Sequence, residues 1–287
     1  MEILKANISS GLRLGCSIKS WFLIPRRRPW LQAILPLIVL APLYGQALNE
    51  PIQLAMLFQQ QVDRRVEVPA VEQRRYATLL RQTLFNAGFA RASAQYVILV
   101  DRNALVQVAM IFWKSDSDEF TFIGASQASS GQPGRFEHFE TPLGVFLHSL
   151  DNPDFRAEGT RNEFGVLGYG RKGLRVYDFG WVNAPKGWGD GRQSVMRLQL
   201  HSTDPELLER RLGSIQSKGC IRISASFNRF IDHYGILDAE YERALAAGQT
   251  FWVLFPDREP TPWSGEFLVV VDTRRDRRPE WSPKPGS

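Results

Sequence analysis

Cysteine is scarce in this 287-residue chain, which contains only Cys16 and Cys220. Cys16 lies in an N-terminal stretch with the features of an export leader, so a mature chain would retain Cys220 alone. A single cysteine excludes an internal disulfide. Cys220 stands in a polar, glycine-containing stretch, whereas free cysteine normally behaves as a small buried hydrophobe. Cys220 is therefore a candidate reactive thiol, and the alternative is an inert, half-buried one.

Apolar runs long enough to cross a membrane are also absent. The apolar stretch of residues 30–43 is interrupted by two prolines and is shorter than the ~20 residues that a membrane span needs. It follows Arg26-Arg27-Arg28 and precedes the small-x-small pattern Gly45-Gln46-Ala47. This order of basic, apolar and small residues predicts a secretory signal peptide over residues 1–47. The alternative is an uncleaved leader that anchors the protein in a membrane.

Basic tracts with interleaved aromatic residues, which nucleic-acid binding uses, are absent as well. The chain has a net charge of +5, but residues 1–47 hold six of its 35 basic and one of its 30 acidic residues. The remaining chain has 29 of each, so its net charge is zero. The excess of basic residues belongs to the export signal, and no nucleic-acid partner is expected.

The chain after the leader is long enough for one large domain. Its first part, residues 48–94, is predicted to be helical. Apolar side chains recur near one face from Val71 to Ala87, and Gly88 follows as a stop. Residues 51–62 indicate a second helix. We expect the two helices to form a cap or arm.

From Tyr96 the pattern changes to short β-rich runs separated by Gly, Pro and Asn turns, without the alternation of strands and helices typical of parallel sheets. It predicts a mainly β fold, with a sandwich or barrel-like domain over residues 95–256 and a strand extension over 257–272. The predicted strands are 96–100, 105–113, 120–128, 145–147, 174–179, 195–200, 250–255 and 266–271. Short helices are expected at 204–213, at 224–234 and at 238–247.

Two segments lack a regular pattern. Residues 164–192 are rich in glycine and aromatic residues, and they indicate either a lid over the sheet or an ordinary series of turns. Trp181 and Trp188 in this segment are interpreted as packing residues, with a substrate platform as the alternative. The tail over residues 273–287 is charged and proline-rich, and it is predicted to be disordered.

The position of His201 follows from an alternation of apolar and polar residues over 196–201, which predicts a strand with one buried face. His201 then lies on the polar side at the end of this strand. The predicted helix after it would carry the chain back, so that residues 217–222 lie beside the strand end. His201 and Cys220 are expected to be neighbours, and an imidazole can hold a thiol as reactive thiolate. The alternative for His201 is an ordinary hydrogen-bonded residue at a strand end.

Three further residues complete the candidate site. Ser202 is the nearest group that can orient the imidazole, through its carbonyl or its hydroxyl. Gly219 lets the backbone approach a substrate, and the amides around Gly219 and Cys220 are candidates for stabilising an oxyanion. Arg222 is suited to bind a carboxylate in bidentate fashion, and the alternative is a structural ion pair.

The order of His201, a helical insert and Ser217-Lys218-Gly219-Cys220-Ile221-Arg222 resembles the signature of the YkuD-type L,D-transpeptidases. That signature is His-Gly, a spacer and Ser-His-Gly-Cys-(Ile/Val)-Arg. Thr141-Pro142-Leu143-Gly144 is similar to the Thr-Pro-x-Gly element that the family carries upstream, and the aromatic helical run after Ser224 is similar too. The resemblance covers about residues 96–254. It implies a largely β catalytic domain that cross-links or modifies peptidoglycan.

Carried over by position, the resemblance implies that Cys220 is the nucleophile and that His201 is its base. The backbone carbonyl of Ser202 would orient the histidine. Gly219 would contribute to the oxyanion pocket, and Arg222 would support the loop and the substrate.

Ser217 and Lys218 belong to the same substrate-binding stretch. The chain departs from the family pattern at two positions, because Ser202 replaces the usual glycine and Lys218 replaces the usual second histidine. The replacement of glycine by Ser202 is expected to have no effect on the activity, because the group that this position contributes is its main-chain oxygen. Lys218 is expected to alter substrate preference more than catalysis, and its ammonium would favour the thiolate.

The implied activity is acyl transfer from peptidoglycan tetrapeptide stems through a thioester on Cys220, with release of D-alanine, in the periplasm or cell envelope. The acceptor is a second stem, an envelope lipoprotein or an outer-membrane protein. The alternatives are a hydrolytic family member, which trims stems or releases a linked protein, and a non-catalytic module that binds peptidoglycan. The reaction implies no cofactor. The other histidines lack the spacing and acidic partners of a metal site and are interpreted as surface or framework residues: His138, His148 and His233.

Overall fold

The computed structural model of the chain describes residues 42–284. The predicted signal peptide lies outside the described residues, except for residues 42–47, which begin helix α1 (Pro42–Gln61). None of the helices in this part of the chain is long and apolar enough to cross a membrane.

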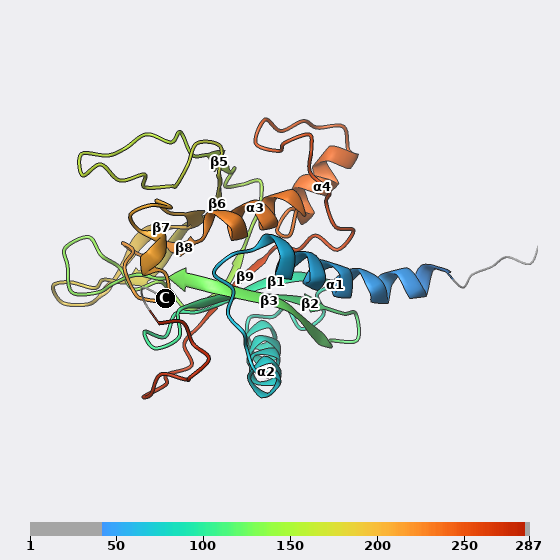
Figure 1. The fold of residues 1–287 in the computed structure, drawn as a ribbon, viewed down its shortest axis with the longest axis horizontal. Helices are drawn as coiled ribbons and strands as arrows, with labels where there is room; N and C mark the ends of the chain where they lie inside the picture. Colours follow the sequence, from blue (N-terminus) through green and yellow to red (C-terminus); the bar gives the residue numbers. More distant parts are fainter. Residues whose placement is uncertain (1–41, 285–287) are drawn as a thin grey trace, which may run out of the picture. The chain divides into compact units, whose positions relative to one another are not determined.

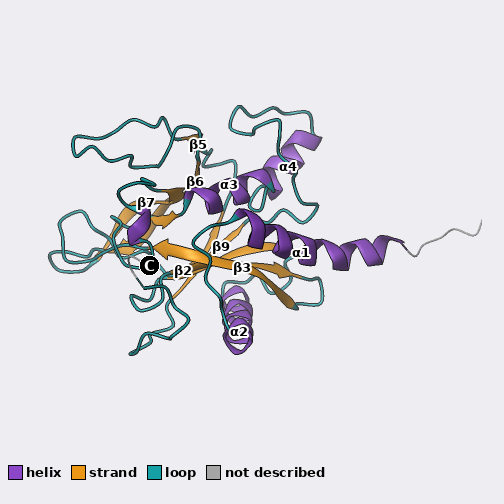
Figure 2. Cartoon of the chain, viewed as in Figure 1, coloured by secondary structure: helices purple, strands orange, loops and turns teal. Residues whose placement is uncertain are grey.

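Nine strands form one curled sheet in the order β4-β9-β1-β2-β3-β8-β7-β6-β5 (Figure 1, Figure 2). The fold is therefore mainly β, as the sequence predicts. The strands are β1 (Gln95–Asp101), β2 (Val108–Lys114), β3 (Phe120–Ser129), β4 (Gly144–Leu147), β5 (Phe155–Arg156), β6 (Arg175–Pro185), β7 (Gln193–Ser202), β8 (Ile221–Ile223) and β9 (Phe267–Val271). The other helical elements in the described residues are α2 (Ala70–Asn86), the 3₁₀ turn η1 (Glu209–Arg211), α3 (Ala225–His233) and α4 (Ala239–Ala246).

β1 is buried on both faces because helices cover both sides of this half of the sheet. Successive side chains of a strand point to opposite faces. Ile98 accordingly joins a core that contains residues of α1 and α3, whereas Leu99 joins a second core formed with α2. Figure 1 shows α2 on one side of β1–β3 and α1 with α3 on the other.

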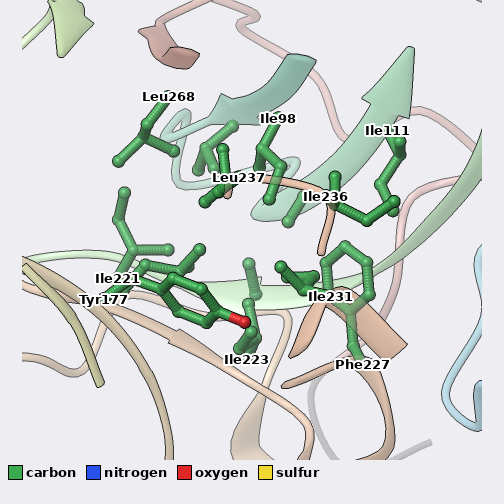
Figure 3. Packing of buried hydrophobic residues seen from close by; sticks show 14 of the residues in the cluster. Ile98, Ile111, Tyr177, Ile221, Ile223, Phe227, Ile231, Ile236, Leu237 and Leu268 are labelled. Atoms are coloured by element: carbon green, nitrogen blue, oxygen red, sulfur yellow. The ribbon is translucent and has the colours of Figure 1, made fainter. Parts of the chain in front are cut away.

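The curl of the sheet brings its two halves around the larger core. Ile98 and Ile111 come from β1 and β2, whereas Tyr177 and Ile221 come from β6 and from the start of β8. All four side chains are fully buried in one cluster (Figure 3). This core, closed by α3, positions β7 and β8, the two strands that carry the candidate site.

The helices α1 and α2 are part of the packed structure and do not form a separate arm. Phe58 of α1 is fully buried and meets the rings of Phe227 and Phe230 edge to face, at centroid distances of 5.7 and 5.2 Å. On β3, a Cβ atom at Gly124 would lie 2.2 Å from the Phe58 ring. The described residues belong to one compact unit, so the predicted boundaries after residues 94 and 256 lie inside it.

β9 is an interior strand, although the sequence suggests a C-terminal extension. It pairs in parallel with β1 and antiparallel with β4, and all five of its residues are buried. The strand predicted over residues 266–271 is present as β9, but its place inside the sheet was not predictable, because pairing between distant strands leaves no local signal in the sequence.

Two predicted local elements are absent. Residues 204–213 form turns and η1 instead of a regular helix, and within them the N–H groups of Leu208 and Glu209 both donate to the Asp204 carbonyl, at 3.0 and 2.8 Å. Residues 250–255 form turns instead of a strand, and within them the Leu254 N–H donates to the Phe251 carbonyl. Of the glycine-rich segment 164–192, the second half is largely the β6–β7 hairpin.

The tail is ordered up to residue 284, contrary to the predicted disorder. Arg275 pairs with Glu72 of α2, and the Trp281 ring meets the Tyr76 ring edge to face at 6.1 Å. The Ser282 hydroxyl donates to the Leu105 carbonyl at 2.8 Å. One aromatic anchor and these polar contacts hold the tail in place despite its charged composition.

Candidate active site

The candidate site forms where β8 runs parallel to β7. Leu200 pairs with Ile221, and both side chains are fully buried in the core. The next pair, His201 and Arg222, therefore points to the opposite face of the sheet. Cys220 directly precedes β8, so the predicted meeting of His201 and the 217–222 stretch at one strand end is present.

The Cys220 sulfur lies against the edge of β7. Sγ is 3.6 Å from the carbonyl oxygen of Arg197, and the backbone N–H of Gln199 points to the sulfur. Cys220 is half-buried and free. Among the described residues the sulfur makes no hydrogen bond to His201. Cys220 stands two positions before Arg222, the partner of His201 on β8, and its sulfur lies upstream of the imidazole along β7.

His201 is held in one tautomer by the backbone next to it. It is 5% exposed, and its Nδ1 lies 2.5 Å from the carbonyl oxygen of Ser202. A carbonyl accepts only, so Nδ1 carries the proton and Nε2 holds the free electron pair of the neutral ring. Burial, with a further effect of the Arg222 charge, lowers the pKa of His201 to about 3. The imidazole is neutral at physiological pH.

The thiol is neutral as well. Burial raises the pKa of Cys220 to about 11, although the Gln199 N–H and the Arg222 charge act in the opposite direction. The expected preformed thiolate is therefore not supported in the free protein.

Ser217 shapes the loop before Cys220. Its hydroxyl donates to the Cys220 carbonyl at 2.5 Å and accepts the Gly219 N–H at 3.0 Å. The side chain is 1% exposed, so the predicted role in substrate contact is not supported. The Gly219 N–H is already used, so its predicted contribution to an oxyanion pocket is not supported. The Cys220 N–H has no hydrogen bond to any described residue and is a candidate donor instead.

Gly219 is required by the shape of the loop. Its φ angle is +132°, and a Cβ atom would lie 2.7 Å from the Met196 sulfur. Positive φ and this close approach both favour glycine. Its role is to let the loop pack against β7.

The two motifs identified in the sequence meet at this loop. The Thr141 hydroxyl donates to the Gly219 carbonyl at 2.7 Å, across 78 residues of sequence. The same hydroxyl accepts the Gly131 N–H at 2.8 Å, and the Arg102 guanidinium donates to the Thr141 carbonyl. Thr141 thus fixes the backbone next to Cys220.

Lys218 lies at the rim of the site. Its side chain is 66% exposed, and its ammonium is 3.5 Å from the carboxylate of Glu137. The ammonium is thus directed to a carboxylate rather than to the Cys220 sulfur, which does not support the predicted stabilisation of a thiolate. Contact with a substrate at the rim stays a prediction.

Arg222 has no hydrogen bond or ion pair with any described residue, and its Nε is buried. The structural ion pair considered for it is not present in this part of the chain. Ser129 pairs with Arg222 from β3, and its buried Oγ has no partner either. Ser129, Arg222 and His201 therefore form a row across three strands. A guanidinium without a counter-charge in this row is suited to bind a carboxylate.

A polar network that sequence reasoning missed supports the imidazole. The Tyr169 ring meets the His201 ring edge to face at 4.8 Å, and its hydroxyl donates to Gln199 at 3.0 Å. Gln199 and Arg197 both donate to Asp178, at 2.9 and 2.7 Å. Gln199 and Arg197 lie on the polar side of the predicted strand, and this position was the signal in the sequence that could have identified them. Nothing local marked Tyr169.

No group of His, Cys, Asp and Glu suited to hold a metal ion occurs among residues 42–284. His148 does have an acidic partner, contrary to expectation, since its Nε2 is 2.8 Å from Asp154. Arg175 occupies the other oxygen of that carboxylate, so the pair is a buried framework contact.

No protein-family model matches the chain, and no curated protein matches it in sequence.

Proposed function

We propose that the protein is a cysteine-dependent acyltransferase of the L,D-transpeptidase type that acts on peptidoglycan tetrapeptide stems. The observation that carries this proposal is the junction of the two sequence motifs, in which Thr141 binds the carbonyl of Gly219 directly before Cys220. The Nδ1 contact of His201 with the Ser202 carbonyl supports it, because it leaves Nε2 as the basic atom.

The first half-reaction forms a thioester. As the Cys220 sulfur attacks the carbonyl carbon of the third stem residue, its proton passes to His201 Nε2. The Cys220 N–H stabilises the oxyanion. The C–N bond to D-alanine then breaks, and the imidazolium returns its proton to the departing nitrogen.

The second half-reaction uses an amine from another stem or from an envelope protein. The amine attacks the thioester and gives a proton to His201, which returns it to the departing sulfur. Arg222 would hold a carboxylate of the stem, since its guanidinium lacks a counter-charge among the described residues. This activity belongs to the periplasm or cell envelope, where its substrate lies.

The first experiment measures release of D-alanine from purified tetrapeptide muropeptides. Cys220→Ala should abolish release, because no other thiol occurs in residues 42–284. Unchanged release would remove Cys220 from the mechanism. Thermal unfolding of the variant serves as the control for folding.

Product analysis of the same reactions separates transfer from hydrolysis. Cross-linked dimers indicate transfer, whereas only shortened monomers indicate hydrolysis. Intact mass after incubation with a carbapenem should show one adduct in the wild type and none in Cys220→Ala. A protein that forms no adduct and releases no D-alanine would be left with the non-catalytic interpretation.

A further inference from the structure

A cavity whose lining includes Tyr169 but not His201 lies next to the candidate site. Its volume is about 430 Å³. Its walls come from β5, from the glycine-rich loop between β5 and β6, and from the turn at Trp252. Tyr169 lines the cavity and also packs on His201 at 4.8 Å. A molecule in the cavity would thus lie one aromatic ring away from the imidazole.

Three aromatic side chains line this cavity. Phe155 and Tyr169 meet edge to face at 5.3 Å, which holds both rings in place. Trp252 is 73% exposed and makes no ring contact with another described aromatic residue. A tryptophan that leaves most of its indole in water at the edge of a cavity offers a flat apolar surface for a ligand.

The polar groups of the cavity are of two kinds. Arg156 is already paired, because its two terminal nitrogens bind Asp232 and the carbonyls of Gly173 and Val253. Glu158 and Thr160 make no side-chain hydrogen bond to any described residue. The cavity therefore offers a carboxylate and a hydroxyl for hydrogen bonding, and no unpaired cation that would select a phosphate or carboxylate.

The loop that forms the cavity is held in a defined place. Asp204, which follows the strand of His201, accepts the Leu167 N–H at 2.9 Å. Gly170 lies so close to β7 that a Cβ atom there would be 2.9 Å from the Ser202 hydroxyl. The cavity is therefore built against the strand that carries the base.

We propose that this cavity binds a neutral sugar ring. The C–H face of the sugar stacks on the Trp252 indole, and its hydroxyls bond to Glu158 and Thr160. We assign the sugar to the glycan strand that carries the stem, and this assignment rests on the proposed function. A stem attached to its disaccharide would then bind more tightly than the free tetrapeptide.

A binding experiment tests the sugar site without any turnover. The probe is the linear tetramer of N-acetylglucosamine, titrated into the wild type and into Trp252→Ala by calorimetry. Trp252→Ala should weaken binding about tenfold or more. Phe164→Ala is the matched control, because Phe164 is a 78% exposed aromatic residue of the loop between β5 and β6 that does not line the cavity.

Glu158→Ala supplies a second variant, which should also weaken tetramer binding. The side chains of Trp252 and Glu158 are exposed, so both variants are expected to keep the melting temperature of the wild type. No binding by the wild type, or equal affinity in wild type and Trp252→Ala, would overturn the proposal.

A kinetic experiment distinguishes this proposal from the function on which it rests. Trp252→Ala should lower kcat/KM about tenfold for disaccharide tetrapeptide and leave it unchanged for free tetrapeptide. Equal losses on both substrates would assign the cavity to peptide and overturn the sugar site. If the wild type turns over neither substrate, the transpeptidase proposal fails, and tetramer binding still decides the sugar site.

Discussion

At the scale of the residue, the central feature is a thiol and an imidazole that burial keeps uncharged. The pKa of Cys220 is raised to about 11 and that of His201 is lowered to about 3. Charge separation between them is therefore unfavourable before a substrate arrives. This supports a mechanism in which the substrate carbonyl, the thiol proton and Nε2 react together.

The pH dependence of alkylation tests this state of the thiol. Because only the thiolate reacts, the rate of iodoacetamide labelling of Cys220 should rise about tenfold per pH unit from pH 7 to beyond pH 9. The rate is measured by intact mass, with Cys220→Ala as the blank. A rate that reaches a plateau near neutral pH would mean that the free protein holds a thiolate.

At the scale of the element, the nucleophile loop depends on a contact from a distant segment. Two hydroxyl groups hold the loop over residues 217–220. The Ser217 hydroxyl forms hydrogen bonds within the loop and sets its turn. The Thr141 hydroxyl binds the loop from outside and fixes its position relative to the sheet.

Substitution of Thr141 removes the hydrogen bond from outside the loop and leaves those of Ser217 within it. Thr141→Ala should lower D-alanine release by about 10- to 100-fold, because the sulfur is no longer held in line with the carbonyl. Thr141→Ser retains the hydroxyl and should recover most of the activity. Equal activity of Thr141→Ala and the wild type would show that the contact with Gly219 does not position the nucleophile.

The packing of α1 on β3 provides a test of the fold at the same scale. Gly124→Ala should lower the free energy of unfolding by about 1–3 kcal/mol, because the new methyl group overlaps the Phe58 ring. Gly168→Ala is the control, since a Cβ atom there has no neighbour within 4 Å. Urea denaturation measures the free energy of unfolding of both variants. Similar stability of the two variants would mean that α1 is not packed on β3 at Phe58.

At the scale of the whole molecule, one buried cation joins elements that are far apart in the sequence. Arg175 of β6 is fully buried, and its guanidinium contacts Asp154, Asp232 and Asp238 at 2.6, 3.3 and 2.8 Å. These carboxylates lie before β5, in α3 and before α4. The network links the outer strands of the sheet to the helices that close the core.

Removal of this cation should be strongly destabilising. Arg175→Met leaves buried carboxylates without their main counter-charge and should lower the free energy of unfolding by about 3–5 kcal/mol. Arg81→Met removes the exposed pair with Asp118 and should cost at most about 1 kcal/mol. Denaturation midpoints at neutral pH measure the difference. Equal losses would show that the Arg175 network does not hold the elements together.

Local features of this chain were predictable. The sequence predicts a helix that starts at Ser224 or Ser226, and the Ser224 hydroxyl accepts the Phe227 N–H at 3.1 Å as the N-cap of α3. The alternation around His201 correctly assigned the buried and polar sides of β7. Such features depend on residues within a few positions of each other. The strand predicted at residues 250–255 failed because it has no pairing partner in the sheet.

By itself, the sequence determined which side chains are able to react and at which strand ends they stand, because side-chain chemistry and strand periodicity are local properties. Only the tertiary structure decided that Thr141 holds the Cys220 loop, that Tyr169 packs on His201 and that β9 lies inside the sheet. It also decided that burial keeps the Cys220 thiol and the His201 imidazole neutral. The physical reason is that burial and neighbouring charge arise from segments that are distant in sequence and meet only when the sheet curls around its core.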